Sequence, residues 1–181
     1  MKNFVVALAL TAAPTLAACE PQPAPPQAPT FSSKGLRAMK AADGAEGSGC
    51  LADSGRLPDG AWFGFVKAWD TAGIDLDPAC FYWRAPAARE AAARNQESPP
   101  PNDFFIANDS KNVRRILVAP DAAAVRVTHT KDGGVTMNDV TTYRGLLADS
   151  GTYIDCPGEF CGVWVFVNGG IATEVTMQYL P

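Results

Sequence analysis

The C-terminal part of the chain constrains the fold most, because it carries the signals of a tight β-hairpin. An apolar run at 163–167 and a second run at 171–180 are separated by Asn168-Gly169-Gly170. Asn-Gly accepts the positive φ angles that a short hairpin turn requires. The second run alternates, which predicts a strand with one face in the core and the other in water. The two alternating sets are Ile171, Thr173, Val175, Met177 and Tyr179, and Ala172, Glu174, Thr176 and Gln178.

The central part of the chain also carries the signals of short strands. The turn Pro58-Asp59-Gly60 opens a β-rich run at 61–69 that is apolar on both faces. Such a run is typical of a strand that is covered on both sides. The same criteria predict further strands at 74–76, 79–83, 103–107, 114–118 and 124–130.

One helix is predicted over Pro86–Glu97. Proline suits the first turn of a helix, Glu90 and Arg94 form an i,i+4 pair, and the prolines at 99–101 end the pattern. Strands with a single helix predict an α+β domain. We expect a mainly antiparallel, twisted sheet or small barrel, with the OB fold as the closest architecture, and one packed helix.

The first residues carry the signals of export. A short apolar run, Phe4–Leu10, follows Lys2 and is too short to span a bilayer, which takes about 20 residues. It leads to Leu16-Ala17-Ala18-Cys19, which resembles the lipobox of bacterial lipoproteins. The resemblance implies a signal peptide at 1–18, acyl chains such as palmitate on Cys19, and attachment of the protein to the membrane of the cell envelope. An ordinary secretory signal cut after Ala18 is the alternative.

Two features follow from the lipobox. Glu20, where Asp would favour inner-membrane retention, favours the periplasmic side of the outer membrane in a Gram-negative cell. Residues 20–30 contain five prolines, a composition typical of a semi-rigid polyproline spacer. Residues 31–49 are rich in Gly, Ala, Ser and Lys. We therefore expect a flexible tether at 19–49 and a single disulfide-linked, β-rich domain at 50–181.

Four cysteines remain once Cys19 is assigned to lipid, and an even number in an exported chain indicates two disulfides. Three pairings are possible. We favour Cys50–Cys80 as the longer link and Cys156–Cys161 across the Cys-Pro-Gly-Glu-Phe-Cys loop. A zinc site is the rival, but the chain has one histidine and no CxxC pair, so no metal is expected.

Composition and charge exclude several classes of protein. The chain is 47% hydrophobic with four tryptophans, which favours a globular domain over disorder. Its net charge of −4 disfavours nucleic-acid binding, which needs a basic surface. No glycine-rich phosphate loop follows a strand, so no nucleotide cofactor is expected either.

Candidate catalytic groups are few. His129 is the one imidazole and alternates with Val125 and Val127, which favours a packed side chain over a catalytic one. Asp75 and Asp77 flank Leu76, and Asp70 precedes a turn, so the three carboxylates form a possible Ca²⁺ or acid–base cluster. A solvated acidic strand face explains the same residues, and no catalytic residue is assigned.

Candidate partner-binding residues fall into two groups. Glu159 and Phe160 lie in the short loop between Cys156 and Cys161, where a rigid loop would expose them. Trp62 and Trp69 lie in a strand-like run, where they either belong to the core or form part of a ligand groove.

From residue 59 onward the chain resembles small secreted or lipid-anchored bacterial proteins that have no established function. The matching segments are 59–66, 102–109, 118–122, 167–170, 173–174 and 178–181. Cys80 and the 156–161 loop depart from that pattern. The resemblance implies one compact β-rich domain and transfers no catalytic residue.

Three functions follow as hypotheses. The first is a membrane-anchored envelope lipoprotein with a non-enzymatic domain that binds a protein, peptidoglycan or a small ligand. The second is an inhibitor of an envelope-directed hydrolase, such as lysozyme or a protease, whose cleft the disulfide-closed loop would enter. The third is a hydrolase that uses carboxylates such as Asp75 and Asp77. We expect the first, and therefore not an enzyme.

Overall fold

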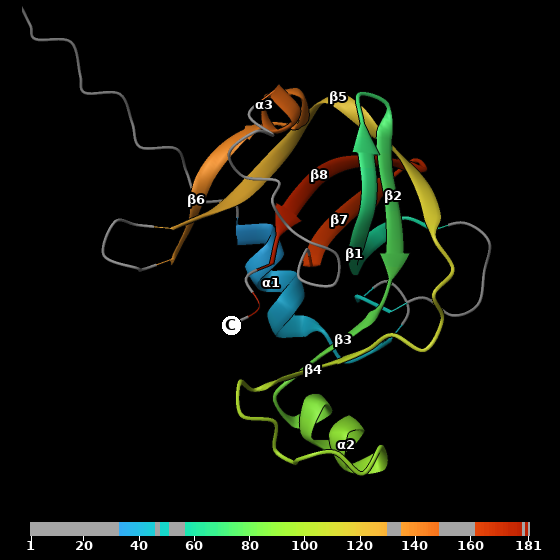
Figure 1. Cartoon of the computed structure of the whole chain (residues 1–181), viewed down its shortest axis with the longest axis vertical. Coiled ribbons are helices and arrows are strands. Elements are labelled where there is room, and N and C mark those ends of the chain that lie inside the picture. The colour runs from blue at the N-terminus through green and yellow to red at the C-terminus, as the bar shows by residue number, and fades with distance from the viewer. Residues whose placement is uncertain are drawn as a thin grey trace, which may run out of the picture.

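The computed structural model describes residues 33–45, 48–50, 57–129, 135–148, 162–178 and 180 (Figure 1). The described helices are α1 (Ser33–Ala41), α2 (Ala85–Ala93) and α3 (Tyr143–Ala148). The described strands are β1 (Gly60–Asp70), β2 (Gly73–Pro78), β3 (Cys80–Trp83), β4 (Phe104–Ala107), β5 (Arg114–His129), β6 (Val135–Thr142), β7 (Gly162–Asn168) and β8 (Ile171–Met177). Within these residues, no helix has the length and apolar character that crossing a membrane requires.

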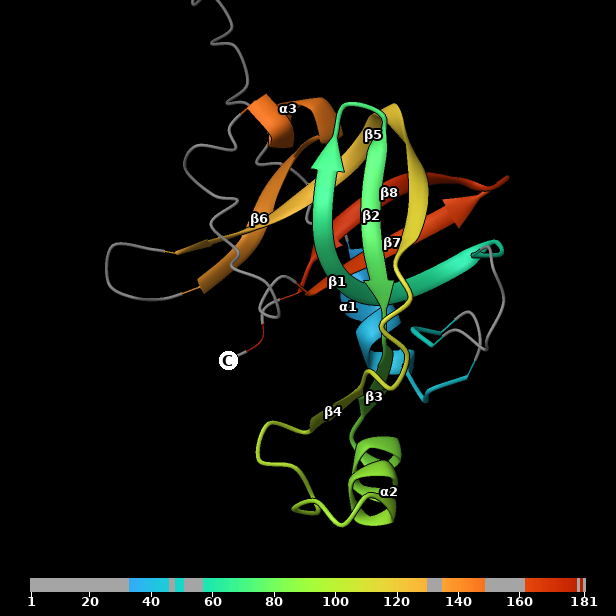
Figure 2. The ribbon, with the colours of Figure 1, turned by 45° about the vertical axis from the view of Figure 1, so that its right-hand side comes forward.

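Five of these strands close a barrel. The strands lie in the order β2-β1-β7-β8-β5, and β5 pairs again with β2 (Figure 2). Every barrel pairing is antiparallel except that of β5 with β8, which is parallel. Numbered along the chain, the barrel strands neighbour one another as 1-2-3-5-4-1, the strand order of the OB fold. The predicted α+β small barrel is confirmed.

The barrel interior is the main core. It contains Trp62, Ile74, Leu76, Val165 and Val175, each with no exposed surface. Gly73 makes the closing β2–β5 contact possible, because a Cβ at this position would lie 2.1 Å from the carbonyl oxygen of Ile116. A side chain there would separate the two strands.

A second apolar cluster lies outside the barrel, on β1 and β7. Phe63, Phe81 and Trp164 are fully buried there, with ring centroids 4.9 to 5.5 Å apart. The two-stranded β3–β4 sheet and α1 cover this face. Strand β1 is apolar on both faces, as predicted, because one face packs in the barrel interior and the other in the outer cluster.

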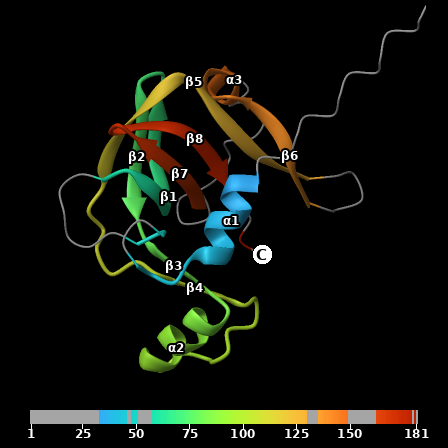
Figure 3. The same ribbon diagram turned by 180° about the vertical axis from the view of Figure 1, so that it is seen from behind.

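The folded part of the chain begins before Cys50, where it was expected to start. Helix α1, which lies within the predicted tether, packs on the barrel (Figure 3). Gly35 lies so close to β8 that an added Cβ would be 2.5 Å from Cγ2 of Thr176. Ala38 and Met39 pack on the outer cluster, and the Ala42 carbonyl accepts a hydrogen bond from the amide of Trp83 at 3.0 Å. The small residues that suggest flexibility in the sequence instead allow close helix packing.

The final strand also departs from the predicted alternation. Phe166 pairs with Glu174 but Val167 pairs with Ala172, so Thr173 is an extra residue in β8. Such a β-bulge shifts the alternation by one residue. Ile171 is therefore exposed and Ala172 is buried, whereas Val175 and Met177 face the core as expected.

Most remaining element predictions hold, with changes in length. The predicted strands at 114–118 and 124–130 are one strand, β5, whose pairing with β8 shifts register between Val118 and Ala123. Helix α2 ends at Ala93, before the expected Glu97, while Arg94 pairs with Glu90 at 2.6 Å as predicted. Strand β6 and helix α3 have no counterpart in the predictions.

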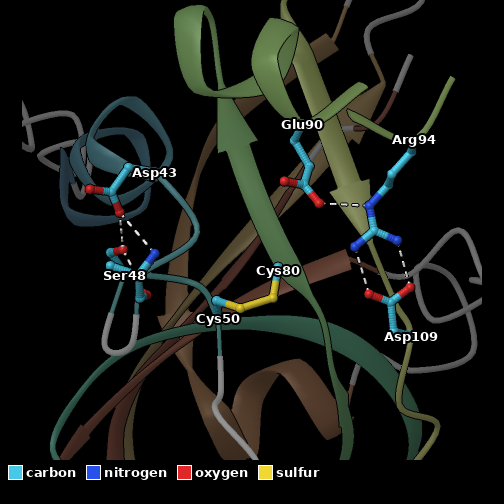
Figure 4. The surroundings of a disulfide bond; sticks show 8 residues. Asp43, Ser48, Cys50, Cys80, Glu90, Arg94 and Asp109 are labelled. Carbon is cyan, nitrogen blue, oxygen red and sulfur yellow. Dashed lines mark hydrogen bonds and ion pairs between the residues drawn. A yellow bond between two sulfur atoms is a disulfide. The ribbon is translucent and has the colours of Figure 1, made fainter. Parts of the chain in front are cut away.

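The predicted Cys50–Cys80 disulfide is present (Figure 4). It links the segment after α1 to β3, and Gly49 packs beside it against the ring of Trp164. Asp43 stabilises the same segment by accepting hydrogen bonds from the amide of Ala45 and the hydroxyl of Ser48. The predicted Cys156–Cys161 bridge lies outside the described residues.

The disulfide predicts a large change in stability. Replacing both Cys50 and Cys80 by Ser frees a loop with a sequence separation of 30 residues, and the added entropy of the unfolded chain is expected to cost about 3–4 kcal/mol. Urea denaturation of the oxidised proteins measures the free energy of unfolding. A loss below about 1 kcal/mol would contradict the predicted effect.

Candidate functional site on the outer face of β2 and β5

Exposed apolar side chains gather on one side of the barrel. Among the described residues, the large hydrophobic side chains that are exposed are Leu117 (54%), Val113 (47%) and Ile171 (42%). Val118 pairs with Ala172 in parallel register, so the residues before them, Leu117 and Ile171, are neighbours on β5 and β8. Leu117 also lies opposite Gly73 of β2, which has no side chain to cover it. We call Val113, Arg115, Leu117 and Ile171 the β5 face.

Arg115 lies at the centre of this face and is held by two carboxylates. Its guanidinium contacts Asp75 at 3.1 Å, across the β2–β5 pairing, and Asp70 at 2.5 Å. These hydrogen bonds raise the pKa of Arg115 above its ordinary value, so its positive charge is fixed. Arg115 and Leu117 are two residues apart in β5, so their side chains lie on one face of the strand, and Val113 directly precedes β5.

Asp70 shapes the β1–β2 turn at the edge of the β5 face. Its carboxylate accepts hydrogen bonds from the amides of Ala72 and Gly73, at 2.8 and 3.1 Å. The amide of Ala72 lowers the pKa of Asp70 most, and Arg115 lowers it further. The carboxylate thus closes its own turn and orients Arg115 at the same time.

Tyr143 of α3 supports this turn from inside. Its side chain is fully buried, and its hydroxyl donates towards the carbonyl oxygens of Gly73 and Asp70, at 2.8 and 3.0 Å. Burial raises the pKa of Tyr143 to about 12. A helix absent from the predictions therefore fixes the backbone that carries Asp70.

A shallow hollow of about 390 Å³ lies beside the start of β8, at the opposite end of the strands from that turn. Leu57, Pro58, Asp59 and the glycines of the β7–β8 turn line it. Asp59 accepts a hydrogen bond from the amide of Gly170 at 3.1 Å, which holds the turn against the entry to β1. Ile171 follows this turn directly, so the hollow adjoins the β5 face.

The three predicted carboxylates do not act as one cluster. Asp70 and Asp75 share Arg115, whereas Asp77 is fully buried, with its ion-pair partner Lys67 at 3.2 Å. Asn108 donates to the same Asp77 oxygen at 3.1 Å. A second segment of chain thus covers Asp77 and separates its environment from that of the other two. Among the described residues, no group of three His, Cys, Asp or Glu side chains is placed to hold a metal ion.

The predicted partner-binding tryptophans belong mainly to the core. Trp62 is fully buried and its indole donates to the Pro58 carbonyl at 2.8 Å, which corresponds to the core position, one of the two expected for it. Trp69 is half-buried and packs against the core in the barrel interior. A strand covered on both faces leaves little room for an exposed aromatic side chain.

The structure does not describe most of the other predicted site residues. Glu159, Phe160, Cys156, Cys161 and Cys19 lie outside the described residues. The backbone of His129 ends β5 and pairs with Val135 of β6. Val113, Leu117 and Ile171 are absent from the predictions as site residues. The signal available in the sequence was the alternation of Val113, Arg115 and Leu117, in which apolar side chains share a face with an arginine.

The support from Tyr143 is expected to depend on pH. The unfolded tyrosine ionises near pH 10 and the folded one near 12, so the stability that the protonated hydroxyl contributes is present below pH 10 and is lost as the pH rises to 12. Tyr143→Phe removes the donor and is expected to cost about 1 kcal/mol at neutral pH.

Chemical denaturation of both proteins across this pH range measures the difference. The unfolding free energies of wild type and Tyr143→Phe should converge as the tyrosine ionises, because the variant has no ionising group at this position. A difference that stays constant up to pH 12 would contradict the inference.

Comparisons of the chain with protein-family models, with curated proteins and with solved structures gave no match.

Proposed function

We propose that the protein is a lipid-anchored protein of the cell envelope whose barrel binds a protein partner, without catalysis, through the β5 face. The observation that carries the proposal is the exposure of Leu117 and Ile171 on neighbouring strands, beside Arg115 and with the exposed Val113 just before β5. Scattered single hydrophobic residues are common on protein surfaces. A contiguous group with a polar centre is typical of an interaction site.

The chemistry of the β5 face favours a protein over a sugar polymer or a small ligand. The buried core of a protein interface is mainly apolar, and arginine is enriched in protein interfaces. Arg115 already has Asp70 and Asp75 as partners. Covering the face therefore does not leave an unpaired charge in the interface, which would oppose binding.

The hydrolase hypothesis finds less support in this arrangement. It needs carboxylates that converge on one point, and Asp77 instead lies buried with Lys67 and Asn108. Asp70 and Asp75 both form ion pairs with Arg115, so their carboxylates are already engaged. The inhibitor hypothesis rests on the 156–161 loop, which lies outside the described residues.

Site-specific photo-cross-linking tests the binding face. A photoreactive phenylalanine derivative at position 117, introduced in intact cells, is expected to cross-link one discrete envelope protein. The same derivative at Ala93, an exposed position at the end of α2, is the matched control. Leu117→Asp should then weaken the interaction by about 30-fold, as loss of a central interface residue does, without unfolding the barrel.

Two outcomes would contradict this proposal. One is cross-linking of the same set of proteins from positions 117 and 93, because contact would then be independent of the face. The other is unchanged affinity of the Leu117→Asp variant for the captured protein.

The anchor is tested separately by the mass of the N-terminal peptide of the native protein. If the lipobox assignment is correct, the peptide begins at Cys19 and carries the mass of acyl chains. Cys19→Ser should abolish that mass and release the protein from the membrane fraction. An intact leader, or an unmodified thiol at Cys19, would overturn the anchor and leave the binding face to be judged on its own.

A further inference from the structure

We infer that the outward face of α1 binds the anionic lipid headgroups of the membrane that holds Cys19. The inference rests on the proposed anchor for its biological setting, but the helix and its charges are structural observations. It concerns a surface distinct from the β5 face. Three properties of α1 support it: its charge, its packing and its position in the chain.

The charge of α1 is opposite to that of the whole protein. The helix contains Lys34, Arg37 and Lys40 and no acidic residue, whereas the complete chain has a net charge of −4. All three basic side chains are exposed, Lys34 by 51%. Residues three apart on a helix lie on neighbouring turns. The three cations therefore form one stripe, in which Arg37 and Lys40 face away from the barrel while Lys34 lies at its flank and contacts Glu174 of β8.

The opposite side of α1 is fixed to the barrel, which orients the stripe. Gly35 contacts Thr176, and Ala38 and Met39 pack on the outer apolar cluster. Lys34 bonds the nearly buried Glu174 at 3.1 Å and lies 5.8 Å from the ring centroid of Phe166. Lys34 thus helps to attach α1 to the barrel and also contributes positive charge. Arg37 and Lys40 lie farther round the helix, away from this contact.

The nearest described acidic side chain along the chain does not oppose this stripe. Asp43 follows α1, but its carboxylate turns back to accept hydrogen bonds from the amide of Ala45 and the hydroxyl of Ser48 (Figure 4). Those hydrogen bonds, that of Ala45 first, lower the pKa of Asp43. Its charge is therefore stabilised within its own turn.

The position of α1 brings the stripe to the membrane. Residues 20–32 separate Cys19 from the first residue of α1, a length that spans at most about 40 Å as polyproline. Within the described part of the chain, α1 is the element that the anchor reaches first. Each cation near an anionic bilayer raises the partition coefficient about fivefold, and the effect acts within about 10 Å at moderate salt.

The occupant that fits these observations is a surface of phosphate-bearing lipids. Dispersed cations on a helix match a laterally mobile array of negative headgroups rather than one bound molecule. On an unanchored protein, three cations give weak but measurable binding. For a chain already held at the membrane they suffice to orient the barrel, because the tether keeps the local concentration of lipid high.

Vesicle partitioning tests the inference without the anchor. The chain from residue 19 to 181 with Cys19→Ser, which retains every described residue, is mixed with vesicles of phosphatidylcholine alone or with about one third phosphatidylglycerol. We expect at least tenfold stronger partitioning to the anionic vesicles, lost when NaCl is raised about fivefold above physiological ionic strength.

A pair of charge-matched variants locates the surface. Arg37→Gln/Lys40→Gln, which leaves Lys34 and its docking contacts intact, should reduce partitioning by about 30-fold. Arg89→Gln/Arg144→Gln removes the same charge from exposed positions on α2 and α3 and should have little effect. Circular dichroism of both variants checks that the fold is retained.

Two results would overturn the inference. One is equal partitioning to neutral and anionic vesicles. The other is an equal loss in both double variants, which would assign the effect to net charge and not to α1. Because the tested chain has no acyl group, either result would stand whether or not native Cys19 is lipidated. The mass of the native N-terminal peptide decides the anchor independently.

Discussion

The whole arrangement depends on the need to bury both faces of β1 and β7. Trp62 and Val165 face the barrel interior, while Phe63 and Trp164 project outward. A barrel alone would leave those outward rings in water, at a cost of about 1.5–3 kcal/mol for each large side chain. Helix α1, the two-stranded β3–β4 sheet and the segment at 48–50 cover them. The additions to the OB-like barrel are therefore part of its core.

This second layer also determines which side of the barrel stays open. The covering elements occupy the outer surface of β1 and β7, and α1 extends the cover to β8. The outer surface of β2 and β5 has the ion pairs of Arg115 and the exposed Leu117 instead. The covered side of the barrel therefore carries α1 and its basic residues, and the uncovered side carries the β5 face.

The sequence predicted the parts of the fold that depend on local pattern. Alternation and turn residues located most strands, and cysteine arithmetic with spacing favoured the observed Cys50–Cys80 link. Helix α1 was missed because Gly and Ala carry no sign of where they pack, and α3 because six residues are too few for a periodic signal. The bulge at Thr173 depends on how β7 and β8 pair, which a single strand does not encode.

The candidate site was predictable only in its charged part. Asp70 and Asp75 were singled out as carboxylates, but Arg115, which gives them their role, lies 40 residues beyond Asp75. Exposure of Leu117 follows from Gly73 on the neighbouring strand and from the parallel pairing with β8. These contacts form only when the barrel closes, so they cannot be predicted from the periodicity of the sequence.

The Cys50–Cys80 link has a mechanical consequence for a chain pulled from its amino terminus. Such a force would load α1 first and would begin to peel it from β8, where its hold is side-chain packing and the Lys34–Glu174 contact. Unravelling would then stop at Cys50, because the covalent bond transfers the load to β3 before any barrel strand is reached. The barrel would therefore keep its shape under a force that detaches α1.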